Sequence, residues 1–258
     1  MILTILQART GSTRLAGKVL SPILGRTMLA LQVERVLRAE KIDELILATT
    51  DDQADDPIER LAGELGIGCF RGSVEDVLDR FYQAALSLSP EHVVRLTGDC
   101  PLIDPVVIDA TVARHLQGGS DYTSNTLNPT YPDGLDVEVF RFEALAEAWR
   151  DARKTSEREH VTPFLYNHPR RFQIESVQQD RNLSEMRWTV DEPEDLAFVR
   201  AVYEELYPVN PAFSTEDILN LLQRRPELGA RNAHIARNEG YVRSVQADEE
   251  GEPRETES

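Results

Sequence analysis

Short apolar stretches alternate with helical patterns along the first half of the chain. Four stretches of mostly aliphatic residues are expected to form buried strands, at residues 2–8, 45–48, 66–70 and 92–96. Helical patterns separate and follow them, at residues 28–39, 57–65, 74–88 and 105–116. Because strands that alternate with helices pair in parallel through right-handed crossovers, the pattern predicts an α/β protein. Its mainly parallel sheet should be covered on both faces.

The rhythm of the pattern changes after residue 120. Strands are expected at residues 121–125, 136–140, 172–177 and 187–190. Helices are expected at residues 142–153, 157–166, about 191–206 and 215–223. Since no repeat or low-complexity linker interrupts this order, we expect one domain over residues 1–242. Its two halves are 1–120 and 121–242.

The net charge of the chain argues against two classes of binding partner, nucleic acids and anionic membranes. The formal net charge is −17. Residues 243–258 hold six acids, two arginines and one large apolar residue, so we expect a disordered acidic tail there. So acidic a protein is a poor non-specific ligand for nucleic acid or an anionic membrane. No apolar run approaches the roughly 18–20 residues of a membrane span.

Two further features favour a cytoplasmic protein. The first six residues lack the basic start and the small-residue cleavage site of a secretory signal. The two cysteines, Cys69 and Cys100, make neither a disulfide framework nor a metal cluster, which fits a reducing compartment.

The loop after the first predicted strand is the clearest candidate for ligand binding. It contains Gly11 and Ser12, and it gathers the basic residues Arg9, Arg14 and Lys18 in a very acidic chain. Backbone N–H groups and a hydroxyl can bind phosphate oxygens, whose charge arginine and lysine neutralise. A solvated basic loop is the alternative. The spacing matches neither the P-loop nor Gly-x-Gly-x-x-Gly.

Acidic residues follow two of the predicted strands. Asp99 lies just past a strand end, where a carboxylate can hold Mg²⁺ against phosphate groups. Asp104 precedes a proline and is expected to cap the next helix instead. For Asp191, the residues alone leave a helix cap and a metal ligand equally open.

Three further segments carry polar residues in less specific patterns. Residues 71–80 place polar groups at a strand end and in the first helical turns. Residues 131–140 join a turn to an alternating strand with two acids on one face. Ser156 and Glu159 have the spacing of a capping box at a helix start. For both cysteines and for the histidines at positions 92, 115, 168 and 234 we expect structural roles only.

Together these motifs resemble the spore-coat polysaccharide biosynthesis F family of cytidylyltransferase-like proteins. The resemblance covers roughly residues 1–241 and rests on segments 7–18, 70–80, 97–104, 131–140, 156–163, 187–191 and 237–241. The family's usual Leu-Pro-Gly-Lys is here Leu15-Ala16-Gly17-Lys18, a change that loosens the loop but removes no phosphate ligand. More distantly, the chain is similar to the cytidylyltransferases that activate 3-deoxy-manno-octulosonate and acylneuraminates.

The resemblance implies a glycosyltransferase-A-like three-layer sandwich, with the nucleotide bound by residues 1–120 and the acceptor by 121–242. It implies that the catalytic triphosphate clamp is Arg9, Arg14 and Lys18. The implied nucleotide-binding residues are Leu6, Gln7, Ala8, Arg9, Gly11, Ser12, Arg14, Lys18, Arg71, Ser73, Asp76, Arg80 and Asp99. The implied acceptor-binding residues are Tyr131, Asp133, Asp136, Glu138, Glu159 and His160. The implied Mg²⁺ ligands are Asp99 and Asp191.

The expected reaction is transfer of CMP from CTP to an acceptor, with release of pyrophosphate, in the biosynthesis of surface polysaccharide. The acceptor would be a small sugar acid, sugar phosphate or phosphonate. A glycosyltransferase that uses a nucleotide sugar is the first alternative, although no Asp-x-Asp motif follows the strand at residues 92–96. A non-catalytic nucleotide-binding partner protein is the second. Whether the protein is a homodimer is left open.

Overall fold

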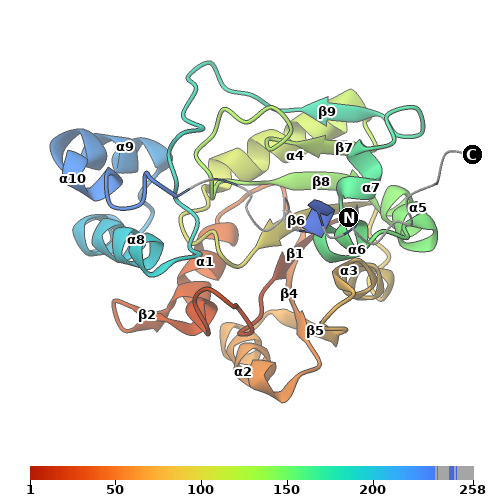
Figure 1. Cartoon of the computed structure of the whole chain (residues 1–258), viewed down its shortest axis with the longest axis horizontal. Coiled ribbons are helices and arrows are strands. Elements are labelled where there is room, and N and C mark those ends of the chain that lie inside the picture. Colours follow the sequence, from red (N-terminus) through yellow and green to blue (C-terminus); the bar gives the residue numbers. More distant parts are fainter. Residues whose placement is uncertain (236, 238–243, 247, 249–258) are drawn as a thin grey trace, which may run out of the picture.

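A seven-stranded sheet runs through the centre of the molecule, in the strand order β5-β4-β1-β6-β8-β7-β9 (Figure 1). The structure is a computed structural model that describes residues 1–235, 237, 244–246 and 248. Four neighbouring strands are parallel: β1 (Ile2–Gln7), β4 (Glu44–Thr50), β5 (Gly68–Gly72) and β6 (His92–Thr97). The expected α/β class with a mainly parallel sheet is confirmed.

The other half of the sheet comes from the second half of the chain. Strand β8 (Glu138–Arg141) is antiparallel to both of its neighbours, β6 and β7 (Tyr122–Ser124). Strand β9 (Ile174–Ser176) is parallel to β7 at the edge. The pairing of β6 with β8 joins the two halves of the chain into one sheet.

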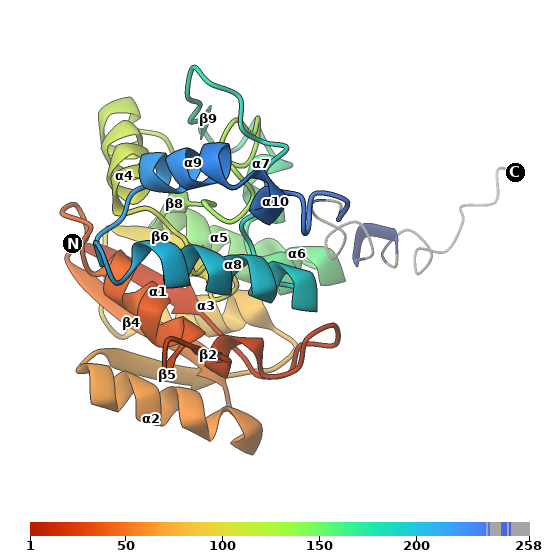
Figure 2. The same ribbon diagram turned by 90° about the vertical axis from the view of Figure 1, so that its left-hand side faces the viewer.

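Helices cover both faces of this sheet (Figures 1 and 2). One core cluster includes residues of α1 (Met28–Val36), α2 (Asp56–Leu65), α4 (Pro105–Gly118), α8 (Pro193–Leu206) and α9 (Thr215–Arg224). The other includes residues of α3 (Val77–Leu86), α5 (Phe142–Asp151) and α7 (Pro163–Tyr166). Alternation along β1 sends Leu3 and Ile5 into the second cluster and Leu6 into the first, as a pleated strand requires.

The shorter elements complete the fold. They are the hairpin of β2 (Pro22–Ile23) and β3 (Arg26–Thr27), the 3-10 turns η1 (Lys18–Leu20) and η2 (Gln53–Asp55), and helices α6 (Thr155–His160) and α10 (Pro226–Gly229). Asp104 accepts from the N–H of Val106 and from Thr215, so its expected role as the cap of α4 is confirmed. None of the helices formed by the described residues has the length and apolar composition needed to cross a membrane.

Two expected elements differ in the structure. The strand expected at residues 187–190 is absent from the described sheet, and only an isolated bridge joins Asp133 to Arg187. The helix expected at 157–166 is two short helices, α6 and α7, because Val161 has φ +71° and Pro163 follows. A proline cannot donate into a continuing helix, and a positive φ for a β-branched residue is a strained turn.

The tail expected to be disordered, 243–258, lies mostly outside the described residues. Of its described positions, Ser244–Gln246 are helical and Asp248 accepts from the backbone N–H groups of Thr155 and Ser156. Ser244 also contacts Glu159 and His160 of α6. For the remaining residues the tail stays a prediction, as do the domain limits.

Candidate functional site

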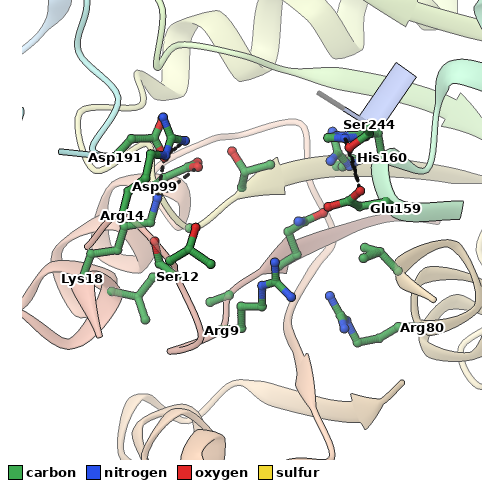
Figure 3. Close-up of a pocket in the computed structure, with 18 residues that line it drawn as sticks. Arg9, Ser12, Arg14, Lys18, Arg80, Asp99, Glu159, His160, Asp191 and Ser244 are labelled. Carbon is green, nitrogen blue, oxygen red and sulfur yellow. Dashed lines mark hydrogen bonds and ion pairs between the residues drawn. The ribbon is translucent and has the colours of Figure 1, made fainter. Parts of the chain in front are cut away.

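A cavity of about 470 Å³ opens beside the carboxyl ends of β1 and β6 (Figure 3). Its lining comes from the loop after β1, from the ends of β1 and β6, from α3 and α6, and from two later segments. These residues are Gln7, Ala8, Arg9, Ser12, Thr13, Arg14, Lys18, Val19, Val77, Arg80, Arg95, Thr97, Gly98, Asp99, Glu159, His160, Asp191 and Ser244. The carboxyl edge of parallel strands is where α/β proteins bind ligands.

Close packing of β1 against β6 sets the floor of this cavity. A Cβ atom at Gly98 would lie 2.9 Å from the carbonyl oxygen of Gln7 and 3.0 Å from the Cβ of Ala8. Only glycine fits this approach, so the backbone of the Thr97–Asp99 turn lies directly against the start of the basic loop. Asp99 thereby faces the residues that the loop carries.

Lys18 connects two acids at one end of the cavity (Figure 3). Its Nζ donates to the carbonyl oxygen of Val190 at 2.7 Å and to Oδ1 of Asp191 at 2.8 Å. The same Nζ lies 3.6 Å from Oδ2 of Asp99. Burial lowers the pKa of Lys18, but the two carboxylates outweigh burial and hold that pKa above its ordinary value. Lys18 is therefore a fixed cation.

Arg14 adds a second cation at this end. Its Nη2 lies 2.9 Å from Oδ1 of Asp191, and its Nη1 lies 3.7 Å from Glu192. Burial raises the pKa of Asp99, yet Lys18 and nearby hydrogen bonds outweigh it and keep that pKa below its ordinary value. Asp99 is thus held ionised beside Lys18, and the carboxylate of Asp191 contacts both Lys18 and Arg14. Such an arrangement can exchange internal ion pairs for contacts with a phosphate chain.

A buried arginine fixes the position of Asp191. Arg187 donates to Asp191 at 3.1 Å, to Asp133 at 3.1 Å and to Asp195 at 2.9 Å. Asp195 also accepts from the backbone N–H groups of Asp191 and Glu192, which closes the first turn of α8. Glu192 is the N-cap residue of α8, so Asp191 does not cap this helix and its carboxylate faces the cavity.

The other end of the cavity holds a histidine beside an acid and a hydroxyl (Figure 3). The Oγ of Ser244 donates to Glu159 at 2.7 Å and lies 3.1 Å from Nε2 of His160. Burial and then the charge of Arg95 lower the pKa of His160 below its ordinary value. The strained Val161 ends α6 directly after His160, and such outliers gather at functional sites. His160 is neutral at neutral pH and can accept a proton.

The capping box expected at Ser156 and Glu159 is wrong. Helix α6 begins earlier, at Thr155, and Glu157 accepts from the backbone N–H groups of Arg153 and Lys154. With Glu157 in the capping role, Glu159 lies at the other end of the short helix and lines the cavity.

The structure places the predicted site residues in two groups. Those that line the cavity are Gln7, Ala8, Arg9, Ser12, Arg14, Lys18, Arg80, Asp99, Glu159, His160 and Asp191. Those outside its lining are Leu6, Gly11, Arg71, Ser73, Asp76, Tyr131, Asp133, Asp136 and Glu138. Most of the second group have other partners, described next.

The residues outside the lining serve mainly in local structure. Arg71 pairs with Asp56 and Glu59 of α2. Asp76 caps α3 by accepting from the N–H of Asp79.

The acids near the 131–140 turn also have internal partners. Asp133 and Asp136 both pair with Arg237, and Asp133 also accepts from Arg187. Glu138 accepts from Tyr122 and Thr162, both at 2.6 Å, and pairs with Arg95. These three acids therefore bind arginines of the protein itself and do not line the cavity.

Sequence reasoning missed several residues of the lining: Thr13, Val19, Val77, Arg95, Thr97, Gly98 and Ser244. Arg95 had a signal, because it is a charged residue within the apolar strand at 92–96. Alternation along β6 puts Arg95 on the same face as Val93, and its guanidinium carbon lies 5.8 Å from the Phe81 ring centre. Ser244 had none, because its segment reads as part of an acidic tail.

Two carboxylates at the loop end have the chemistry of a Mg²⁺ site. Among the described residues, no group of three or more histidine, cysteine or acidic side chains could hold a metal ion. Asp99 and Asp191 are a pair, however, and both contact the single ammonium group of Lys18. Since Mg²⁺ often takes one or two carboxylates and fills its other positions with water and phosphate oxygens, the pair fits this ion.

Comparison with known proteins shows which family the chain belongs to, because the matches cover most of its length. The model of the cytidylyltransferase family matches residues 3–222. The spore coat polysaccharide biosynthesis protein SpsF of Bacillus subtilis is 36% identical over 88% of this chain and 95% of its own length. A cytidylyltransferase structure from Leptospira borgpetersenii has a TM-score of 0.84 at 31% identity, covering 88% of this chain and 96% of that one.

A more distant structure shares the fold. It is a CMP:2-keto-3-deoxy-manno-octonic acid synthetase in complex with CTP, with a TM-score of 0.61 at 18% identity. The match covers 79% of this chain and 98% of that one.

Proposed function

We propose a reaction for this chain from the premise that it belongs to the cytidylyltransferase family: it transfers CMP from CTP to a small anionic acceptor and releases pyrophosphate. The similarity to SpsF, a spore coat polysaccharide biosynthesis protein, supports a role for this transfer in polysaccharide biosynthesis. The named substrate of the distant synthetase makes a sugar acid one candidate acceptor.

One observation carries the proposal. Arg14 and Lys18 on the loop after β1 meet Asp99 and Asp191 at one end of a cavity at the carboxyl edge of the sheet. A triphosphate that enters there can take the two cations from Asp191, so internal ion pairs are exchanged for phosphate contacts. Arg9 and Ser12 line the same cavity and offer further donors.

The residues divide the chemistry between the two ends of the cavity. An acceptor oxygen attacks the α-phosphorus in line, and Arg14 and Lys18 neutralise the charge that moves onto the departing pyrophosphate. Neutral His160, at the other end, accepts the proton of the attacking hydroxyl, while Glu159 and Ser244 orient its ring. An acceptor that attacks through an already ionised oxygen does not need this base.

We further propose that Asp99 and Asp191 hold Mg²⁺ during turnover. The bound ion would supply charge neutralisation at the phosphates. Lys18 lies between the two carboxylates, and it supports the proposal because it marks the place where a cation is stabilised. The cytoplasm is the proposed compartment, since Cys69 and Cys100 are both free thiols.

Nucleotide binding is the direct test of the proposal. Thermal unfolding is measured with CTP, ATP, GTP and UTP, each with Mg²⁺, and pyrophosphate release from CTP is followed with sugar acids, sugar phosphates and phosphonates. We expect CTP to stabilise most, by about 2.7 kcal/mol at 100 times its dissociation constant, and one anionic acceptor class to support turnover.

The same experiment separates the alternatives. A nucleoside diphosphate sugar that stabilises the protein more than CTP would indicate a glycosyltransferase. Binding of CTP without pyrophosphate release from any acceptor would indicate a nucleotide-binding partner protein. Whether the protein forms a homodimer stays a prediction, open to measurement of its mass in solution.

A further inference from the structure

The end of the cavity opposite Lys18 is rich in positive charge that the described acids only partly neutralise. Arg9, Arg80 and Arg95 all line this cavity (Figure 3 labels the first two). Arg9 contacts no acid within the described part of the chain. Arg80 donates to the carbonyl oxygen of Ser73, and its Nε is buried with no partner. Burial and then the charge of Arg9 lower the pKa of Arg80 to about 10.

Arg95 is held more firmly than the other two. It lies opposite Glu138 in the register of β6 and β8, and its Nη1 donates to Glu138. Glu138 also accepts from Tyr122 and Thr162, so a buried network from three elements fixes the carboxylate and, through it, the guanidinium. Directly opposed charges of opposite sign stabilise a sheet and fix the direction of a side chain.

This network leaves hydrogen-bond donors of Arg95 unused. Among the residues that the structure describes, only its Nη1 has a hydrogen-bond partner, and its Nε is buried without one. The side chain is 12% exposed and lines the cavity, so Nη2 is the donor that a ligand can reach. An ionised oxygen bound there would use a donor that water reaches poorly.

The position of Arg95 relates this donor to the acceptor. Arg95 shares the carboxylate of Glu138 with Thr162, two residues after His160, and its charge acts on His160. Lys18 and Arg14 lie at the end of the cavity opposite His160 (Figure 3). An acceptor whose hydroxyl faces His160 therefore has a fixed cation within reach. A neutral acceptor of the same size would leave the free hydrogen-bond donors of Arg95 without an ionised partner.

We propose that Arg95, held by Glu138, is the anion-binding residue of the acceptor subsite: it selects acceptors that carry an oxyanion besides the attacking oxygen. The oxyanion is a carboxylate, a phosphate or a phosphonate. This inference rests on the proposed function, because it takes the end of the cavity at Lys18 as the triphosphate site. It makes Arg95 a specificity residue and Glu138 its positioning residue.

The test uses small anions on the full-length protein loaded with saturating CTP and Mg²⁺. Methylphosphonate and acetate are titrated separately, which distinguishes a phosphonate-type from a carboxylate subsite. We expect Arg95→Gln to weaken the preferred anion by about tenfold or more while the thermal shift caused by CTP stays unchanged. Arg95→Lys should keep part of the affinity, and Arg60→Gln, at an exposed arginine, should keep all of it.

A double variant guards against misfolding of the single one. Arg95→Gln leaves the carboxylate of Glu138 buried without its cation, which can unfold the protein. Arg95→Gln/Glu138→Gln replaces the ion pair by two amides that can bond to each other, and it should show the same loss of anion affinity. Pyrophosphate release adds a second readout: wild type should use glucuronate or glucose 6-phosphate in preference to glucose.

The outcomes separate this inference from the proposed function. If CTP gives no thermal shift in the wild type, the proposed function fails and the inference falls with it. If CTP stabilises the protein, the inference is overturned when neither anion binds, when Arg95→Gln binds them as well as the wild type, or when glucose is used equally.

Discussion

At the scale of single residues, the carboxylate of Asp191 has two roles, because it contacts three cations and is also a proposed ligand of Mg²⁺. Lys18, Arg14 and Arg187 all contact it, so it holds three cations in place without a ligand. Asp99 contacts only Lys18 among these cations. We therefore expect the two acids to contribute differently, with Asp99 the more available ligand for Mg²⁺ and Asp191 partly engaged in organising the basic loop.

Substitution of each acid by its amide tests this division. Asp99→Asn should reduce turnover by at least about 10²-fold and abolish the Mg²⁺ dependence of the CTP thermal shift, because a neutral amide binds the ion poorly. Asp191→Asn should cause a similar loss of turnover and also weaken CTP binding without Mg²⁺, because Arg14 and Lys18 lose their anchor. Asp180→Asn, at an exposed acid, should change neither measurement. Unchanged Mg²⁺ dependence in both site variants would remove the metal from the mechanism.

At the scale of elements, a pair of histidines joins β6, α4 and β7. His115 Nε2 lies 3.0 Å from His92 Nδ1, and His115 Nδ1 lies 3.0 Å from Oγ1 of Thr123. Burial, then His92 and Arg141, lower the pKa of His115 to about 4. The structural roles expected for these two histidines agree with this geometry, since a neutral ring can bond on both sides.

This contact predicts a pH dependence of stability. The unfolded chain protonates His115 near its ordinary pKa of 6.5, and the folded chain does so only near 4, so the unfolded state binds more protons between these values. The contribution of His115 is therefore full above pH 6.5 and is lost as the pH falls towards 4, by about 3 kcal/mol. His115→Gln should flatten this part of the curve in urea unfolding, and His234→Gln, at an exposed histidine, should not. Equal slopes for the wild type and both variants would contradict the prediction.

At the scale of the whole molecule, residues 244–246 and 248 lie beside α6 and the cavity. Ser244 contacts Glu159 and His160, and Asp248 accepts from the first N–H groups of α6. Figure 2 shows the helical turn at 244–246 beyond the end of α6. Ser244 and Asp248 thus support the helix that carries Glu159 and His160 at the end of the cavity opposite Lys18.

Two truncations test the role of this segment. Removal of residues 249–258 should leave the melting temperature and turnover nearly unchanged, because these residues are polar and acidic and contain no large apolar side chain. Removal of residues 244–258 also takes away a helix cap worth about 0.5–2 kcal/mol, which lowers the melting temperature by a few degrees for a chain of this size. It should also raise the KM for the acceptor. Identical behaviour of the two truncations would show that Ser244 and Asp248 do not contribute.

The sequence by itself determined the alternation of strands and helices, the basic loop and the acids that follow two strands. These are local properties. A short apolar run predicts a buried strand whichever strand it pairs with, and an aspartate before a proline, such as Asp104, marks a helix start in any context. The family resemblance then predicted that Asp99 and Asp191 act together although 91 residues separate them, and in the structure both contact Lys18.

Only the tertiary structure decided which polar residues face the cavity. Asp133, Asp136 and Glu138 belong to one sequence motif, yet arginines of the protein itself pair with their carboxylates, because an acid withdrawn from water needs a partner more than a solvated one does. Arg95 is part of the site because β8 pairs with β6 and places Glu138 opposite it. The order of the strands in the sheet cannot be read from the sequence of either strand alone. Ser244 is part of the site because it contacts Glu159 and His160 of α6. Such a long-range contact cannot be predicted from the local composition of the sequence.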